Sequence, residues 1–326
     1  MTETDPTALS RELEKRAISQ LDKDTFPKNA RFLFFEAVDL TTKLDHHDQL
    51  KNLLDEMLHS ILFLGNIHAA KYNPEDIFEK THDPIMRRFP EPFQYYQTHV
   101  PLRTPFSYFL ELVVKFYGQN NEETVKDKLS RTLKKYKESA AKNTPLISTV
   151  MCICASGESR HYGVSLSCGS DKAKNIMTAV SCEHVWHPKV SSAVMSVFPD
   201  DAGEPRSIKL PDTVRCRAYA IADTRQLKPP CKRCNQLYSL PDPTDHLNTP
   251  GNCAETEAIS NFIKTEKHAC YGNFKKRLFK RRQEKRAEIG QRMSDYFDKE
   301  MNELMDKRLA KNRNKYRISR FYHPKK

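Results

Sequence analysis

The stretch PCKRCNQLYSLPDPTDHLNTPGNCAETEAI, residues 230–259, contains two short cysteine motifs that decide our interpretation of the fold. The first motif is PCKRC, residues 230–234, and the second is CAE, residues 253–255. A proline is favoured at a helix start, and a Cys-x-x-Cys spacing in a first helical turn lets both sulfurs reach one ion. The second motif also begins an amphipathic segment. We therefore predict that two helix starts hold one metal ion between three thiols, those of Cys231, Cys234 and Cys253.

Three cysteine ligands suggest two kinds of zinc site. They leave the fourth tetrahedral position of Zn²⁺ open for water, as catalytic zinc requires, and Glu255 is placed to accept a proton from that water. Alternatively, His246 fills the fourth position and completes a closed Cys3His site, which predicts no catalysis. The spacing of the residues does not decide between these two kinds of site.

The chain around these motifs alternates between strand and helix signals. Residues 146–155 and 161–168 are rich in β-branched and apolar residues and flank a Gly-Glu turn signal, which predicts a β-hairpin. Residues 189–198 and 214–222 are further strand candidates. Strands mixed with helices predict an α/β domain over residues 143–272.

The first part of the chain, residues 1–142, is predicted to be an all-α domain. Apolar residues recur every three to four positions between residues 50 and 64, as one buried helix face requires. This face is interpreted as core, with a seam for a protein partner as the alternative. Residues 106–117 and 122–142 continue the helical pattern.

The positive charge of the chain is concentrated near its end. The 326 residues include 54 Lys and Arg against 42 Asp and Glu. The composition is that of a globular protein, and the length is enough for about two domains. Residues 264–326 alone hold 21 Lys and Arg against 8 Asp and Glu. We predict a basic helical tail over residues 273–326.

This tail is a candidate for binding RNA or single-stranded DNA, because Lys and Arg neutralise phosphates without reading sequence. The same run is also typical of a nuclear localisation signal or of a solvated helix face. The candidate nucleic-acid contacts are Lys275, Lys276, Arg277, Lys280, Arg281 and Arg282.

The sequence lacks a membrane span and an export signal. Its longest uncharged apolar stretch, residues 60–70, is about half of what a bilayer requires, and its acidic, polar start does not resemble a secretory signal. We therefore expect an intracellular protein, in the cytoplasm or nucleus, with no membrane partner. Its nine cysteines are then reduced thiols or metal ligands. Five of them are interpreted as strand or helix filler, namely Cys152, Cys154, Cys168, Cys216 and Cys270.

The two motifs resemble those of the zinc-dependent cytidine deaminase superfamily, whose signature joins a His/Cys-Ala-Glu helix to a Pro-Cys-x-x-Cys helix. The likeness covers residues 219–237 and 253–259, and extends further if residues 146–168 are the family's first two strands. It implies a three-layer α/β fold with a mixed sheet and a Zn²⁺ cofactor. It also implies that Cys231, Cys234 and Cys253 are ligands and that Glu255 is the proton shuttle.

The chain departs from the family's pattern in three ways. The Pro-Cys-x-x-Cys motif precedes the Cys-Ala-Glu motif, which reverses their order. Three-cysteine members place an Arg after the catalytic Glu, whereas this chain has Thr256, so Lys232 or Arg233 is the expected source of positive charge. The stretch GVSLS, residues 163–167, has serines where free-nucleoside enzymes hold the ribose with Asn-x-Glu.

The function that the resemblance implies is zinc-dependent hydrolytic deamination of a nucleobase, in RNA or single-stranded DNA. The alternative is a non-catalytic zinc-stabilised module that binds nucleic acid or a protein.

Overall fold

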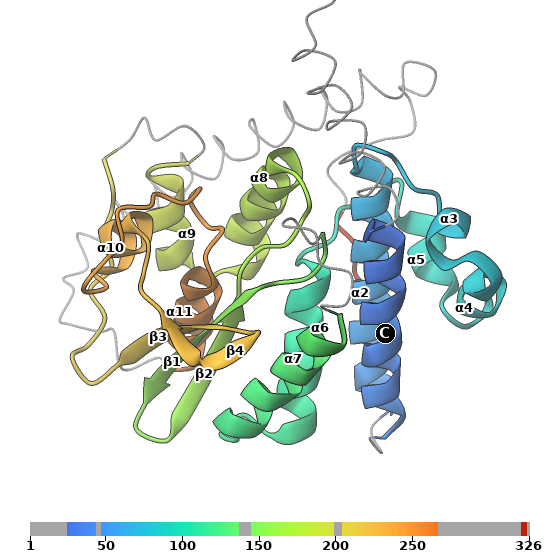
Figure 1. The fold of residues 1–326 in the computed structure, drawn as a ribbon. Helices are drawn as coiled ribbons and strands as arrows, with labels where there is room; N and C mark the ends of the chain where they lie inside the picture. Colours follow the sequence, from blue (N-terminus) through green and yellow to red (C-terminus); the bar gives the residue numbers. More distant parts are fainter. Residues whose placement is uncertain (1–24, 44–46, 137–144, 199–203, 267–320, 325–326) are drawn as a thin grey trace, which may run out of the picture.

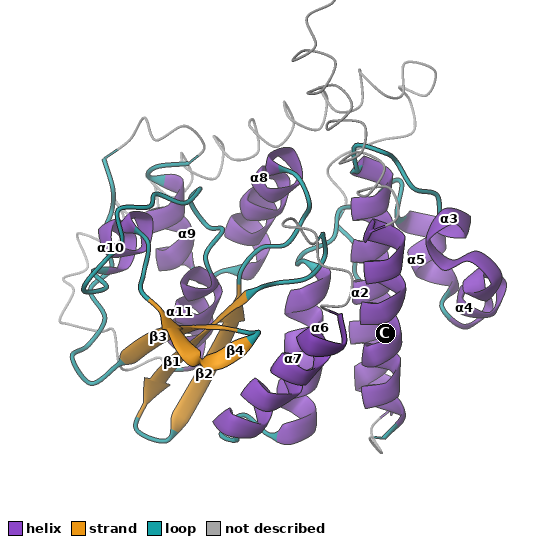
Figure 2. Cartoon of the chain, in the orientation of Figure 1, coloured by secondary structure: helices purple, strands orange, loops and turns teal. Residues whose placement is uncertain are grey.

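The computed structural model describes residues 25–43, 47–136, 145–198, 204–266 and 321–324 as a mixed α/β fold (Figures 1 and 2). A helix over residues 25–42 comes first. The helices before the sheet are α2 (His47–Ile67), α3 (Pro74–Phe78), η1 (Glu79–Thr81), α4 (His82–Arg88), α5 (Pro90–Tyr95), α6 (Pro105–Tyr117) and α7 (Glu122–Tyr136). Then come β1 (Val150–Ser156), β2 (Ser159–Val164), α8 (Asp171–Val180), η3 (Ser181–Val185), α9 (Pro188–Met195), β3 (Arg215–Ala220), β4 (Asp223–Lys228), α10 (Lys232–Tyr238) and α11 (Ala254–Thr265).

Four strands form an open sheet in the order β2-β1-β3-β4. The predicted hairpin is confirmed, because β1 and β2 pair antiparallel from Met151 opposite Val164 to Ser156 opposite Ser159. The other two described pairings are antiparallel as well, so the sheet is not the mixed sheet that we expected. Only residues 221–222 separate β3 from β4, and a link this short joins antiparallel strands only.

The prediction of a strand over residues 189–198 is wrong, because helix α9 covers most of these residues. Pro188 takes the first helical position, and the ring Nδ1 of His187 accepts a hydrogen bond from the Lys189 amide. Both features favour a helix start. The buried residues then recur at helical spacing on one face, as in Val190, Ala193 and Val194.

The two faces of the sheet are covered by different helices. Side chains alternate along a strand, so Gly163 on β2 and Cys152 opposite it on β1 share one face. Helix α11 packs on this face, so closely that a Cβ atom on Gly163 would overlap the backbone of Ala254 and Ala258. The first turn of α11 is therefore held against the sheet.

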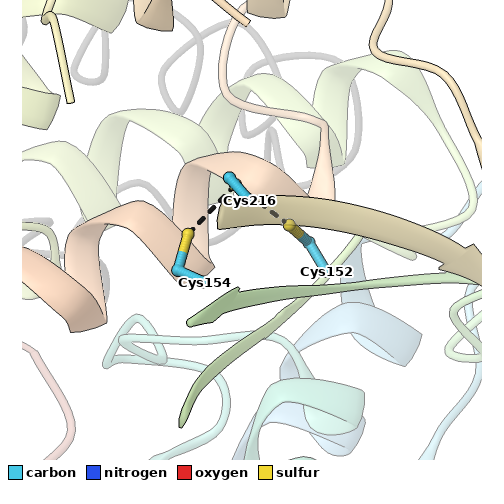
Figure 3. A group of neighbouring side chains, drawn as sticks. All are labelled: Cys152, Cys154 and Cys216. Carbon is cyan, nitrogen blue, oxygen red and sulfur yellow. Dashed lines mark hydrogen bonds between the residues drawn. The ribbon is translucent and has the colours of Figure 1, made fainter. Parts of the chain in front are cut away.

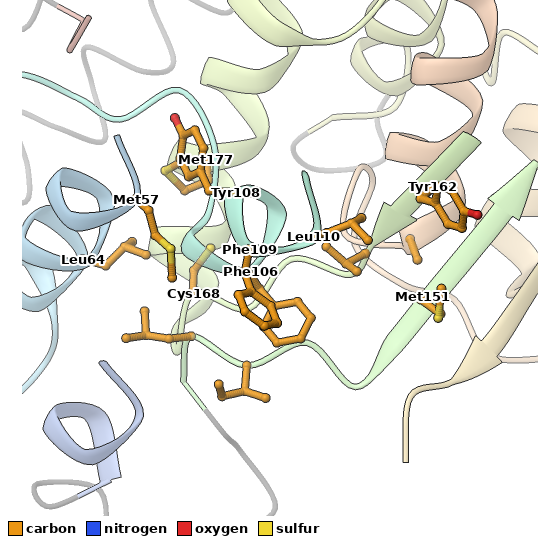
Figure 4. Close-up of a cluster of buried hydrophobic side chains, with 14 of the residues drawn as sticks. Met57, Leu64, Phe106, Tyr108, Phe109, Leu110, Met151, Tyr162, Cys168 and Met177 are labelled. Atoms are coloured by element: carbon orange, nitrogen blue, oxygen red, sulfur yellow. The ribbon is translucent and has the colours of Figure 1, made fainter. Parts of the chain in front are cut away.

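Helices α6 and α7 lie against the opposite face. The Tyr162 hydroxyl donates to the carbonyl of Gln119 at 2.8 Å, and the Lys126 ammonium lies 4.1 Å from the ring centre of Tyr219. Figure 4 shows side chains of α2, α6, β1 and β2 in one hydrophobic cluster that continues from the helices to the sheet. The division into domains at residues 142 and 272 stays a prediction.

Residues 321–324 pack against the helices near the start of the chain. Phe321 pairs with Val100, and the Tyr322 amide donates to the Val100 carbonyl at 3.0 Å. The Tyr322 ring is buried and stacks on His59, with 4.0 Å between ring centres. Residues 321–324 of the predicted basic helical tail are not helical, and the rest of that tail lies outside the described residues. No helix within the described ranges has the length and apolar character to cross a membrane.

Candidate metal centre

Both cysteine motifs lie at helix starts, as the sequence predicts. Cys231 is the N-cap residue of α10 and Cys253 is the N-cap residue of α11, each with extended backbone angles. Cys234 lies in the first turn of α10. An N-cap side chain points back toward the first turn, so each motif presents its sulfur at the end of its helix.

The three sulfurs converge on one point. The Sγ atoms of Cys231, Cys234 and Cys253 all lie within 4.8 Å of one another, and those of Cys231 and Cys253 are 3.5 Å apart. Tetrahedral zinc with Zn–S bonds of about 2.3 Å separates its sulfur ligands by roughly 3.8 Å. The donor set and its spacing therefore fit a zinc ion with three thiolate ligands.

His246 does not belong to this group. Within the described part of the chain, no fourth Cys, His or carboxylate donor joins the three sulfurs. The His246 side chain is exposed, and its carbonyl accepts a hydrogen bond of 2.8 Å from the Lys232 amide. The geometry thus favours the open site over the closed Cys3His site.

Glu255 lies in the first turn of α11 beside the sulfurs. Its side chain is only 5% exposed. Burial raises the pKa of this carboxyl to about 7, and negative charge on Cys216 and Cys231 acts in the same direction. Hydrogen bonds from its own backbone and from Cys234 oppose the shift. A carboxyl with this pKa takes up and releases protons near neutral pH.

Cys231 is the thiol that ionises first. Hydrogen bonds from the side chains of Cys234 and Cys253 lower its pKa to about 2, with further help from backbone N–H groups of Cys234 and Asn248. The same contacts raise the pKa of the Cys234 and Cys253 thiols. The contacts among the three sulfurs therefore favour ionisation of Cys231 over that of Cys234 and Cys253.

Sequence reasoning missed the polar partner of Cys253. The side-chain amide of Asn248 donates to the Cys253 sulfur at 3.1 Å. The guanidinium of Arg233 donates to Gln236 on its own helix at 2.8 Å, and the expectation that Lys232 or Arg233 offsets the sulfur charge stays a prediction. No spacing rule in the sequence identifies Asn248, because the loop between the two helices brings it to the sulfur.

At the position where the family has an arginine, Thr256 forms a structural contact. The Tyr238 hydroxyl donates to the Thr256 hydroxyl at 3.0 Å, and both residues are buried. This bond joins α10 to α11 in the first turn of α11, three residues after Cys253. Thr256 therefore fixes the two helices relative to each other and supplies no charge.

A cleft of about 490 Å³ opens beside the centre. This volume lies within the range of small-molecule sites in proteins. Cys231, Cys253 and Glu255 line it together with polar side chains from the segment after β2, from α8 and from the loop over residues 239–252, among them Ser165, Ser167, Lys174, His246, Asn248 and Asn252. Water and a polar ligand can therefore reach the carboxyl and the sulfurs.

The candidate nucleic-acid contacts Lys275, Lys276, Arg277, Lys280, Arg281 and Arg282 lie outside the described residues, so their assignment stays a prediction.

Comparisons with known proteins gave no match: no family model, no curated protein and no solved structure is significantly similar to this chain. The likeness to the cytidine deaminases therefore rests on the two motifs and on the convergence of their sulfurs.

Proposed function

We propose that this chain is a zinc-dependent hydrolytic deaminase that acts on a nucleobase in RNA or single-stranded DNA. The observation that carries the proposal is the position of Glu255. Its buried carboxyl lies beside three converging sulfurs and lines an accessible polar cleft.

Glu255 has the chemistry of a proton carrier for this reaction. A Zn²⁺ ion bound by the three cysteines would supply a water molecule of lowered pKa. Glu255 passes one proton of the attacking water to the ring nitrogen and then passes the second, from the hydroxyl left on the ring carbon, to the departing amino group. The carbon–nitrogen bond to the amino group breaks, ammonia leaves and a carbonyl replaces it. A carboxyl with a pKa of about 7 suits both halves of this transfer.

The cleft and the charge of the chain support the choice of substrate. The cleft volume of about 490 Å³ accommodates a nucleobase with its sugar. The lining of the cleft offers hydroxyl and amide groups for hydrogen bonds. The net positive charge of residues 264–326 favours a nucleic-acid substrate, with its phosphate backbone, over a free base.

Replacing Glu255 by alanine tests the proposed catalyst. We expect Glu255→Ala to retain the zinc of the unmodified chain, because the sulfurs stay, and to lose ammonia release by about 10²–10⁴-fold, the usual contribution of general acid–base catalysis. Zinc content and ammonia are measured on the same preparation, with cytidine- and adenosine-containing single strands as substrates.

Glu257→Gln is the matched control. Glu257 is a buried carboxyl on the same helix that accepts a hydrogen bond of 2.8 Å from the Val164 amide, and glutamine can keep that bond. This variant should retain ammonia release. A chain that binds zinc but releases no ammonia even when unmodified would support the non-catalytic binding module instead.

The predicted nucleic-acid contacts are tested by changing charge, not by truncation. Removing residues 273–326 would also remove the buried Tyr322, so a truncated chain would mix a folding defect with a binding defect. Substituting glutamine for the six basic residues over 275–282 should flatten the dependence of log Kd on log salt for single-stranded RNA by up to about 4, at roughly 0.7 per phosphate contact. An unchanged slope would show that these six residues do not contact the phosphates of the RNA.

A further inference from the structure

A second group of three cysteines lies on the sheet and shares no sulfur with the two motifs (Figure 3). Cys152 and Cys154 belong to β1 and Cys216 belongs to β3. The sulfur of Cys216 is 3.0 Å from that of Cys154 and 3.3 Å from that of Cys152. All three sulfurs lie within 4.8 Å of one another. We call them the sheet triad.

The strand register brings these sulfurs together. Cys152 and Cys154 are two positions apart, so both side chains leave β1 on the same face of the sheet. Cys154 is directly opposite Cys216 in the antiparallel pairing of β1 with β3. All three side chains therefore point to the face that α11 covers.

These contacts are closer than ordinary core packing. Carbon atoms in contact rest about 3.5–4.0 Å apart, and sulfur is the larger atom, yet two sulfur pairs of the sheet triad lie at 3.0 and 3.3 Å. They are thiol–thiol hydrogen bonds, which apolar packing does not explain. An ion bound by all three thiols would replace these bonds and set the sulfurs roughly 3.8 Å apart, a separation that their present grouping within 4.8 Å allows.

The surroundings of the sheet triad are closed. Cys152 and Cys154 are completely buried and Cys216 is half-buried. None of the three lines the cleft beside the motif helices. Within the described ranges, no further Cys, His or carboxylate donor joins the three sulfurs. An ion here would have sulfur ligands only.

We propose that Cys152, Cys154 and Cys216 bind a second metal ion, a soft ion of the Zn²⁺ or Cu⁺ kind, which joins β1 to β3. Thiolate ligands select these ions, and three-coordination by sulfur suits Cu⁺ in particular. Binding releases the thiol protons to solvent, with no change in the oxidation state of sulfur.

Metal stoichiometry of the full-length chain tests the proposal. Protein stripped by a chelator under reducing conditions is reloaded with Zn²⁺ in one arm and with Cu⁺ in the other, and bound metal is counted per chain. Cys216→Ala should bind one ion fewer than the unmodified chain in at least one arm. Equal stoichiometry in both proteins, in both arms, would overturn the proposal.

Two further variants assign the loss to the sheet triad. Cys231→Ala should lose the ion of the motif helices and retain the one on the sheet, so failure of one site is distinguishable from failure of the other. Cys182→Ala, a buried cysteine outside both groups, should retain every ion. If it loses as much metal as Cys216→Ala does, the effect is unspecific and the proposal fails.

The unmodified chain provides a measurement that does not depend on how a variant folds. The ion of the motif helices adjoins an open cleft, whereas the ion of the sheet triad is enclosed. Removal of metal by excess chelator should therefore be biphasic, with the slow phase absent from Cys216→Ser. A single phase in the unmodified chain, at the rate of Cys216→Ser, would contradict an enclosed ion.

Discussion

Asp55 shows how a single buried carboxyl affects the stability of the protein. It lies on α2 with a side chain only 7% exposed. Burial raises its pKa to about 6, although the charge of Lys51 opposes the shift. The protonated form is therefore favoured in the folded state. Its contribution to stability is complete below the unfolded pKa of about 3.9 and is lost as the pH rises through about 6.

Replacing Asp55 by asparagine should remove this pH dependence. We expect Asp55→Asn to raise the free energy of unfolding by about 3 kcal/mol above pH 7, because a shift of one pKa unit corresponds to about 1.4 kcal/mol. Near pH 4 the gain should vanish. Urea denaturation at both pH values measures it. Asp39→Asn is the control: exposed Asp39 pairs with Lys43 at 2.6 Å, so this variant should lower the free energy of unfolding above pH 7. If Asp39→Asn raises it as Asp55→Asn does, burial of the Asp55 carboxyl is not the cause.

Among the secondary-structure elements, the contact between β2 and α11 determines the geometry of the metal centre. Gly163 is the point of closest approach, where any side chain would meet the helix backbone. Three positions further on, the Leu166 amide donates to the carbonyl of Asn252, the residue before Cys253, at 3.0 Å. The strand thus fixes the position of the second cysteine motif.

Gly163→Ala should therefore both destabilise the fold and weaken the metal site. Overpacking costs about 1–3 kcal/mol, and we expect the upper end because backbone atoms cannot move aside as a flexible side chain can. Urea denaturation gives the free energy and competition with a chelator gives the zinc affinity. Gly157→Ala is the control: nothing lies within 4 Å of its added Cβ, and only its φ of +54° adds a cost of about 1 kcal/mol. Equal losses in both variants would contradict this account.

Elements with a local signal could be predicted from the sequence, and contacts between distant elements could not. Pro230 and the apolar spacing of Ala258, Ile259 and Phe262 identify α10 and α11 because these signals act within one helix. The prediction of a strand over residues 189–198 failed because Pro188, at the first helical position, and the His187 cap start a helix there. The sheet triad was interpreted as filler because strand register, which no local pattern specifies, brings Cys216 to Cys154.

In the whole molecule, residues 321–324 connect the helices near the start of the chain with the region after the sheet hairpin. Tyr322 stacks on His59 of α2, and the Phe321 ring lies 3.8 Å from that of His184 in η3, between ring centres. These contacts join elements more than a hundred residues apart. The segment therefore contributes to the stability of the whole fold.

Tyr322→Ala should destabilise the full chain by about 3 kcal/mol, as the loss of a buried aromatic ring usually does. Thermal and urea unfolding measure the effect. His323→Ala, an exposed neighbour, should leave stability within about 0.5 kcal/mol of the unmodified chain. If the two variants are indistinguishable, the segment does not support the fold.

The reversed order of the motifs gives the loop over residues 239–252 an unusual position. It leaves α10 after the first two cysteines, is held to the helix start by Thr244 and His246, and reaches α11 at the third cysteine while lining the cleft. The loop is thus a wall of the cleft, and within it only Asn248 donates a side-chain hydrogen bond to a sulfur of the three. Evolution or an engineer can remodel the rest of this wall to admit a larger or smaller guest without altering the cysteines.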